Sequence, residues 1–246
     1  MAIFTDGTIS IIEDLIGYES AILEAATTEQ IDLTVKLGLA QEELGIELEA
    51  YLSWRDSTLG LGNIVVTEPL HKWHTFRTLA LVYRDAYHRQ LNDRYLAKWK
   101  EYQKLAQWAW DALLEIGLGI VIDPIPRAAM PQLSYVPVAV SAATYFVRVA
   151  WRNIDAEEGS PSEMAILSVP EGNGLVVTPV SAPAQARSWN VYAGLSVTDQ
   201  TLQNEAPLAV EEAWTEPVSG LRQGTPAGTG QAPDYFLRPG PKVLWG

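Results

Sequence analysis

The sequence predicts a multidomain α+β protein in which an N-terminal α-helical bundle precedes an antiparallel β-sandwich and an extended C-terminal tail. Up to about Pro124, apolar residues recur every three or four positions, and glycine and proline are sparse. Beyond Pro124 this spacing is lost, and short Val-, Tyr- and Trp-rich runs alternate with turn residues. The predicted parts are a bundle over 1–123, a Pro-rich linker over 124–135, a sandwich over 136–219 and a tail over 220–246.

The first predicted helices are set by capping signals and by an apolar stripe. The spacing of Ser10 and Glu13 is that of a capping box, so a short helix should begin there and be interrupted at Gly17. A further short turn or helix is expected over 18–26. Thr27 and Thr28 then offer an N-cap for a long helix. Its apolar stripe is Leu33, Leu37, Ala40, Leu44, Leu48 and Tyr51.

Two more long helices follow a loop over 56–63. Pro69 suits the first position of one helix, because its missing N–H has no partner there anyway. Asn92 can cap the other, and Gly117 is placed to end it. The stripe of the first is Trp73, Phe76, Ala80, Tyr83 and Tyr87. The stripe of the second is Tyr95, Trp99, Tyr102, Ala106, Ala109, Leu113 and Ile116.

Composition narrows the classes of function. The net charge of −13 argues against wrapping nucleic acid, which requires a basic surface. There is no cysteine, which excludes disulfides and thiolate metal sites. The first residues do not resemble a signal peptide, and no run approaches the roughly 18 apolar residues of a membrane span. We therefore expect a soluble protein without membrane contact.

The motif-like patterns do not predict a catalytic, cofactor or metal site. Carboxylate-x-x-His pairs occur at Glu68–His71 and Asp85–His88, but a carboxylate-bridged di-metal site draws them from separate helices. A third ligand is not indicated beside His71 and His74. Nucleophile elbows and phosphate-binding loops are absent from the sequence. We therefore expect that the protein is not an enzyme and takes no cofactor.

Charge is distributed unevenly over the helical half. Carboxylates dominate up to Glu68, whereas basic residues dominate from Lys72 to Lys104. These opposite charges could lie side by side within one bundle. They could also meet between neighbouring copies in a ring, where complementary potentials set the orientation.

Three segments of the helical half resemble the helical-bundle head–tail connector (adaptor) proteins of tailed bacteriophages. The first reads LGLAQEELG and continues through Glu47-Leu48 to Tyr51-Leu52. The second is Leu70-x-x-Trp-His-Thr followed by LALVY, and the third runs from Tyr95-x-x-Lys-Trp to Leu114-x-x-Gly.

The resemblance implies a place in the virion and a set of partners. Copies of the protein, about a dozen, would form a closed ring. The ring would lie beneath the portal protein in the neck, contact a downstream neck or tail protein, and be made in the host cytoplasm. Genome DNA would pass through without specific binding, so the channel wall should be acidic or neutral. The expected channel-facing residues are Glu42, Glu43, Glu47 and Glu49. The expected inter-subunit basic residues are Arg77, Arg84, Arg89, Arg94 and Lys98.

The second half reads as short strands separated by turns. The strand 144–151 places Tyr145, Val147, Val149 and Trp151 on one face. Further strands are expected over 164–169, 174–180, 188–193 and 212–214. The runs YFVRVAW, GSPS and WNVYAG resemble a fibronectin type III or Ig-like module over 136–217. Trp151, Trp189 and Tyr192 are then either its core or a surface aromatic patch. The latter corresponds to an alternative function, a phage binding or decoration module whose sandwich recognises host glycan or protein.

The C-terminal tail combines proline and glycine with large apolar residues, which excludes a helix and favours extended pairing or insertion into a pocket. It either packs on its own domain or docks on the portal or an adjacent copy. The expected anchor residues are Tyr235, Phe236, Leu237, Arg238 and Trp245.

Overall fold

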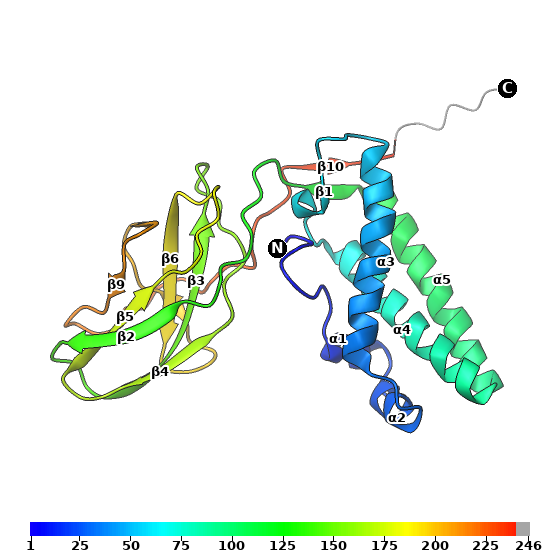
Figure 1. The fold of residues 1–246 in the computed structure, drawn as a ribbon, viewed down its shortest axis with the longest axis horizontal. Helices are drawn as coiled ribbons and strands as arrows, with labels where there is room; N and C mark the ends of the chain where they lie inside the picture. The colour runs from blue at the N-terminus through cyan, green and yellow to red at the C-terminus, as the bar shows by residue number, and fades with distance from the viewer. Residues whose placement is uncertain (240–246) are drawn as a thin grey trace. The chain divides into compact units, whose positions relative to one another are not determined.

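The computed structural model describes residues 1–239, which form two compact units (Figure 1). The β unit contains Met1–Asp6 and Val121–Ala232. The helical unit contains Gly7–Ile120 and the chain from Pro233 onward. The chain therefore passes from one unit to the other three times, and the division does not follow the predicted boundaries. Trp245, one of the expected anchors, lies outside the described residues.

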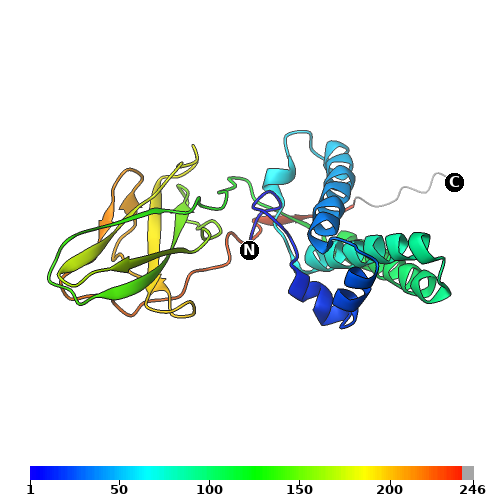
Figure 2. The same ribbon diagram turned by 60° about the horizontal axis from the view of Figure 1, so that its bottom comes forward.

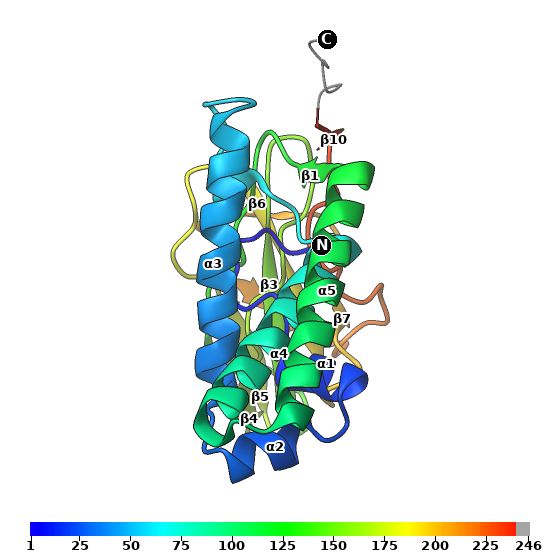
Figure 3. The same cartoon turned by 90° about the vertical axis from the view of Figure 1, so that its right-hand side faces the viewer.

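Five α-helices precede the strands, as the α+β prediction requires. They are α1 (Ile12–Tyr18), α2 (Ile22–Thr28), α3 (Leu33–Ser53), α4 (Glu68–Gln90) and α5 (Asp93–Ile116), with a short 3-10 turn, η1, at Leu61–Asn63. In Figure 2 the blue helices α1 and α2 lie beside α4, which they contact. Figure 3 shows α4 between α3 and α5, and both of these helices pack against it. Among the described residues, no helix is both long and apolar enough to cross a membrane.

Local signals explain where α5 begins and ends. The side chain of Asn92 accepts a hydrogen bond from the backbone N–H of Arg94 at 2.9 Å, which caps the helix as predicted. Gly117 ends it with φ of +107°, a conformation that favours glycine. Pro69 lies in the first turn of α4, where the helix loses no hydrogen bond.

Two predicted N-caps were wrong, although a short helix does begin close to Ser10. Thr27 and Thr28 lie in the last turn of α2 and do not cap α3. The cap of α3 is Asp32, whose Oδ1 accepts from the N–H groups of Thr34 and Val35 at 2.8 and 3.2 Å. Ser10 does not cap α1, because its side chain is buried and bonded to α4.

The predicted stripes form the core of the helical unit. The buried members on α3 are Leu33, Leu37, Ala40, Leu44 and Leu48. On α4, Trp73, Phe76, Ala80 and Tyr83 are buried, and on α5 the buried members are Tyr102, Ala106, Ala109 and Leu113. Ile116, at the end of the last stripe, is exposed because α5 ends there.

The tail does not run free over its described part. Strand β1 (Leu118–Ile120) pairs antiparallel with β10 (Tyr235–Leu237), with Gly119 opposite Phe236. A Cβ atom on Gly119 would lie 2.9 Å from Cγ of Pro233, so only glycine allows the chain to pass this closely. Ile64 forms an isolated bridge to Ile120 on the same small sheet.

The β unit consists of two antiparallel sheets around a shared core. Its strands are β2 (Gln132–Pro137), β3 (Ala143–Arg152), β4 (Ala165–Val169), β5 (Asn173–Thr178), β6 (Ser188–Gly194), β7 (Thr201–Leu202), β8 (Leu208–Ala209) and β9 (Trp214–Thr215). One sheet has the order β2-β5-β9, and the other has the order β4-β3-β6-β7 with β8 also paired to β6. The predicted inward face of β3 is confirmed, since Tyr145, Val147, Val149 and Trp151 are all buried.

The expected linker over 124–135 belongs to the β unit. Ile125 and Ala128 are buried in its core, and β2 already begins at Gln132. The backbone N–H of Arg127 donates to Oδ1 of Asp6 at 2.7 Å, which attaches the N-terminal residues to this unit. The prolines keep this stretch extended, but burial of its apolar side chains stabilises the core, so the stretch packs on the β unit.

Candidate functional site

The charges of α3 and α4 are largely paired within the helical unit. Arg77 Nε donates to Oε2 of Glu43 at 2.6 Å, and its Nη2 lies 3.7 Å from Oε1 of Glu47. Lys36 of α3 forms an ion pair with Asp85 of α4. One edge of α3 is thus joined to α4 by three ion pairs. At this edge the opposite charges therefore lie side by side within one bundle, which is the first of the two alternatives for the charge pattern.

The other expected basic residues also have intramolecular neighbours. Arg84 lies 3.7 Å from Asp85, and Arg89 donates to the backbone carbonyl of Glu29. Lys98 Nζ lies 2.8 Å from Oε2 of Glu19. Arg94 is exposed at the start of α5 and lines a pocket. The structure therefore does not gather the five basic residues into one free surface.

The four expected channel-facing carboxylates separate into two pairs. Glu43 and Glu47 are bound to Arg77, whereas Glu42 and Glu49 are exposed and form no ion pair among residues 1–239. Helical geometry places Glu42 and Glu49 on the side of α3 opposite its buried stripe. They share that side with Val35, Leu39 and Ile46, whose exposed fractions are 53%, 39% and 69%.

Sequence reasoning missed this second apolar face of α3. Its signal was present, since Val35, Leu39 and Ile46 are spaced by four and seven residues. The stronger stripe on the buried side explained the helix by itself, and the four glutamates were assigned together to the channel wall. An exposed apolar stripe on a helix that already has a buried one indicates a contact surface.

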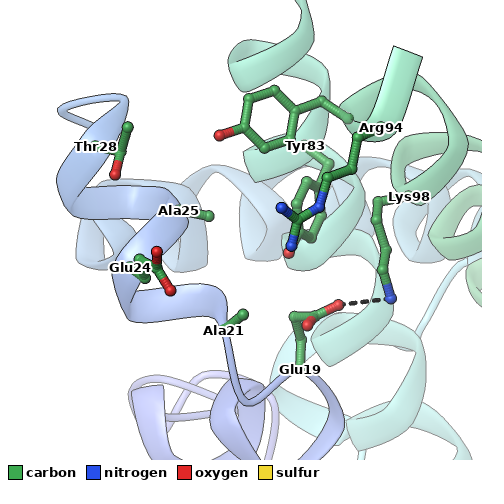
Figure 4. Close-up of a pocket in the computed structure, with 9 residues that line it drawn as sticks. Glu19, Ala21, Glu24, Ala25, Thr28, Tyr83, Arg94 and Lys98 are labelled. Atoms are coloured by element: carbon green, nitrogen blue, oxygen red, sulfur yellow. Dashed lines mark ion pairs between the residues drawn. The ribbon is translucent and has the colours of Figure 1, made fainter. Parts of the chain in front are cut away.

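A small pocket of 160 Å³ lies between α2, α4 and the start of α5 (Figure 4). Glu19 and Lys98 form an ion pair across it, and Tyr83 and Arg94 line its wall. Burial alone would raise the pKa of Glu19, but hydrogen bonds from Lys98 and Tyr102 lower it overall. The hydrogen bond to Glu19 raises the pKa of Lys98. Both groups stay charged at neutral pH, so this pair is a structural ion pair and is not poised for proton transfer.

A second polar cluster is buried in the helical core. His74 Nδ1 lies 2.9 Å from Oγ of Ser10, and Nε2 lies 3.0 Å from the carbonyl oxygen of Leu37. Burial lowers the pKa of His74 to about 4, so the imidazole is neutral at physiological pH. The side chain is fully enclosed and cannot meet a substrate.

The motif-like histidine pairs do not converge on a metal site. His71 Nε2 lies 3.2 Å from Oδ2 of Asp14, and Glu68 pairs with Lys72 at 3.2 Å. His88 contacts the rings of Tyr87 and Trp99. Over the described part of the chain, no three His, Asp or Glu side chains are grouped to hold a metal ion.

In the β unit, the aromatic residues in question belong to the interior. Trp151, Trp189 and Tyr192 are buried, and the hydroxyl of Tyr192 donates to the carboxylate of Glu158 at 2.7 and 2.9 Å. They do not form a surface aromatic patch. A separate hollow of 460 Å³ is lined by amide, arginine and tryptophan side chains, among them Gln203, Trp214 and Arg222.

The described tail anchors lie against the helical unit. Tyr235, Phe236 and Leu237 form β10, and Arg238 Nε donates to the carbonyl of Ile116 at 2.9 Å. Tyr235 and Phe236 nevertheless keep exposed apolar surface. Residues 235–238 therefore pack within the chain, but on the helical unit and not on the β domain that the intramolecular alternative named.

Comparison of this chain with protein-family models, with curated proteins and with solved structures found no match.

Proposed function

We propose that this chain is a structural virion protein, a head–tail connector (adaptor) subunit that forms a ring under the portal in the neck of a tailed phage. The observation that carries this proposal is the outer side of α3, where Val35, Leu39 and Ile46 are exposed. A stripe of branched apolar side chains on a well-formed helix is stabilised when another subunit covers it. The helix order and the residue patterns of the helices resemble those of connector proteins, and this resemblance is the reason for proposing a neck ring as the assembly.

A non-enzymatic role agrees with the chemistry of the buried polar groups. Glu19 is neutralised by Lys98, and His74 is enclosed and uncharged. Neither group is both accessible and poised for proton transfer.

Genome passage fits the strongly acidic chain, because negative charge keeps DNA from adhering to the ring. The individual carboxylates of α3 are weaker candidates for a channel wall. Glu43 and Glu47 share the single positive charge of Arg77, and Glu42 and Glu49 are interleaved with apolar side chains. We therefore assign the outer side of α3 to a neighbouring subunit.

The β unit is proposed to be a fibronectin type III or Ig-like module. Trp151 and Trp189 are buried between its two antiparallel sheets, and inward-facing residues of both sheets form the core of such sandwiches. The hollow beside Trp214 favours a second candidate function, recognition of a host glycan or protein by this unit. Its exposed polar side chains, Thr215, Ser219 and Arg222, could hydrogen-bond a sugar, whereas Trp214 is buried in the core.

Oligomeric state separates the two functions. Native mass spectrometry and negative-stain imaging of the full chain, with and without portal protein, should show closed rings of about a dozen copies for a connector. A chain that stays monomeric even with portal present would contradict the proposal. A trimeric or peripheral protein that binds host glycan would favour the second candidate. Tight, salt-sensitive binding of duplex DNA by the ring would contradict the proposed passage of the genome.

A further inference from the structure

We propose that two specific helix faces join neighbouring copies of this chain: the outer face of α3 on one copy and the outer face of α5 on the next. The outer face of α3 is Val35, Leu39, Glu42, Ile46 and Glu49. The outer face of α5 is Ala97, Lys100, Lys104 and Trp108. This inference deepens the proposed connector function and rests on it for the closure of the ring.

The outer face of α3 combines apolar surface with unpaired negative charge. At 100° per residue, its five members lie within one strip of the helix, about 180° from the buried stripe. The other charged residues of α3 that face α4, Lys36, Glu43 and Glu47, already have partners there. Glu42 and Glu49 remain as carboxylates beside Ile46, and a partner with apolar surface and positive charge would complement them.

The outer face of α5 has those properties. Lys100, Lys104 and Trp108 succeed one another at steps of four residues, opposite the buried stripe of this helix. Both lysines are exposed, and neither forms an ion pair within residues 1–239. The indole of Trp108 is 55% exposed. Tryptophan and long cationic stems are well suited to cover aliphatic side chains.

The positive part of this face is limited to the first half of α5. Asp111 and Glu115 follow Trp108 toward the end of the helix, and both are exposed. The α3 face of the neighbouring copy must therefore align its glutamates with Lys100 and Lys104. This restriction fixes the register of the contact as well as its partner.

The positions of the two faces in the helical unit set the symmetry. α3 and α5 both pack on α4, which lies between them in Figure 3, and each turns its outer face away from α4. A contact between two different faces is heterologous, and its repetition gives a closed ring when the rotation between copies divides a full turn. An isologous dimer would instead need both faces of one copy to contact its partner at the same time, which two faces that each turn away from α4 do not do.

Reversing the charges on each face gives a direct test. The double variants E42K/E49K and K100E/K104E, made in the full chain, each oppose like charges at the contact. Each should weaken self-association at least about tenfold in sedimentation velocity, relative to the unmodified chain. E171K/E211K is the matched control, because it reverses two exposed glutamates of the β unit, and it should leave association unchanged. Circular dichroism verifies that every variant keeps its helices.

An equimolar mixture of the two variants is the decisive sample. When the variants alternate, the lysines of one α3 face meet the glutamates of the next α5 face, and the following contact has the original signs. Association should return to within about threefold of the unmodified chain, and native mass spectrometry should find equal numbers of both variants in each assembly.

Several outcomes would overturn the proposed contact. They are an unmodified chain that stays monomeric at every concentration, a loss of association in only one of the two variants, and a mixture that fails to recover. A different result would show that the contact is correct but that the connector function is not. In that case the mixture recovers as expected, but the assemblies formed by the unmodified chain do not bind portal protein.

Discussion

Oγ of Ser10 lies 2.9 Å from Nδ1 of His74, although the two residues are 64 positions apart in the sequence. The carbonyl of Leu37 can only accept, so Nε2 of His74 carries the proton and Nδ1 accepts from the Ser10 hydroxyl. Oγ1 of Thr75 lies 2.8 Å from Oγ of Ser10, and its one proton can be donated either to that oxygen or to the backbone carbonyl of His71. One neutral imidazole thus joins the segment before α1, the second turn of α4 and the first half of α3.

Removal of the serine hydroxyl should destabilise the helical unit. Ser10→Ala leaves Nδ1 of His74 buried without a donor, which should cost about 1–3 kcal/mol in urea unfolding. Thr8→Ala is the matched control, because the side chain of Thr8 is exposed, and its effect should stay within about 0.5 kcal/mol. Equal effects of the two substitutions would show that the hydrogen bond to His74 contributes nothing.

His74 should also make the helical unit less stable in weak acid. Its pKa is about 4 in the folded protein because of burial, against the ordinary 6.5 in the unfolded chain. Between these values the unfolded state binds more protons, so the free energy of unfolding falls as the pH decreases from 6.5 to 4. The total loss is about 3 kcal/mol, and this contribution does not change above pH 6.5.

The comparison with His74→Gln isolates this titration. Urea unfolding at pH 7, 6, 5 and 4 should give a shallower decline for the variant, whose amide does not titrate. His71 and Asp14 lie near His74 and are present in both proteins, so their contributions cancel to first order. Parallel curves for the two proteins would contradict the assignment.

The stability of the helical unit should depend on the positive charge that Lys98 places beside Glu19. Lys98→Met keeps the stem of the side chain but leaves Glu19 largely buried without its cation. We expect a loss of about 1–3 kcal/mol, although the carboxylate retains its hydrogen bond from Tyr102 at 3.0 Å. Lys98→Arg keeps the charge and should recover most of the stability. A full-sized loss in the arginine variant would indicate that packing, and not charge, is responsible.

Two truncations separate the structural and the docking roles of the C-terminal segment. A chain that ends at Ala232 lacks β10 and leaves β1 without its antiparallel partner, so the helical unit should melt at a lower temperature. A chain that ends at Pro239 keeps β10 and should melt like the full chain. If the Pro239 chain also loses portal binding, the residues beyond it, which include Trp245, carry the docking role. Equal melting of all three chains would show that β10 adds no stability.

Ile46 should matter for assembly and not for folding. Ile46→Gln removes an exposed branched side chain from α3, and glutamine is at least as good a helix former. The free energy of unfolding of the monomer should change by less than about 0.5 kcal/mol. Self-association measured by sedimentation should weaken about tenfold or more, because the contact loses most of one apolar side chain. Leu44→Gln provides the contrast, since its buried position should destabilise the helix packing itself.

The sequence was sufficient where a signal is local. Asn92 and Gly117 mark the two ends of α5 without reference to any other part of the chain, and both assignments are confirmed. The alternation along β3 likewise identified Val147 and Trp151 as inward-facing. Such signals operate within one helical turn or one strand, so a single sequence contains them completely.

The remaining features depend on partners that are distant in sequence. The cap of α3 is an exception, because Asp32 bonds to Thr34 and Val35 and is a local signal that was overlooked in favour of Thr28. Arg77 looked free because its partner Glu43 lies on another helix. Ser10 has the spacing of a local cap and serves instead as a tertiary hydrogen-bond partner. Such partners are brought together only when the core folds, so a short stretch of sequence does not identify them.

Because the chain passes three times between its units, segments that pair in the helical unit are synthesised far apart in time. Arg238 bonds to the carbonyl of Ile116, 122 residues earlier, so the ribosome releases all five helices and β1 long before the strand that completes their sheet. Closing a loop of that length is entropically unfavourable for an unfolded chain. A folded β unit would reduce this cost, since the side chain of Gln231 accepts from the N–H of Ile125 at 2.6 Å and holds the two ends of the inserted segment together. The helical unit is thus completed only after the β unit has been synthesised, and its strand β1 lacks its partner β10 until then.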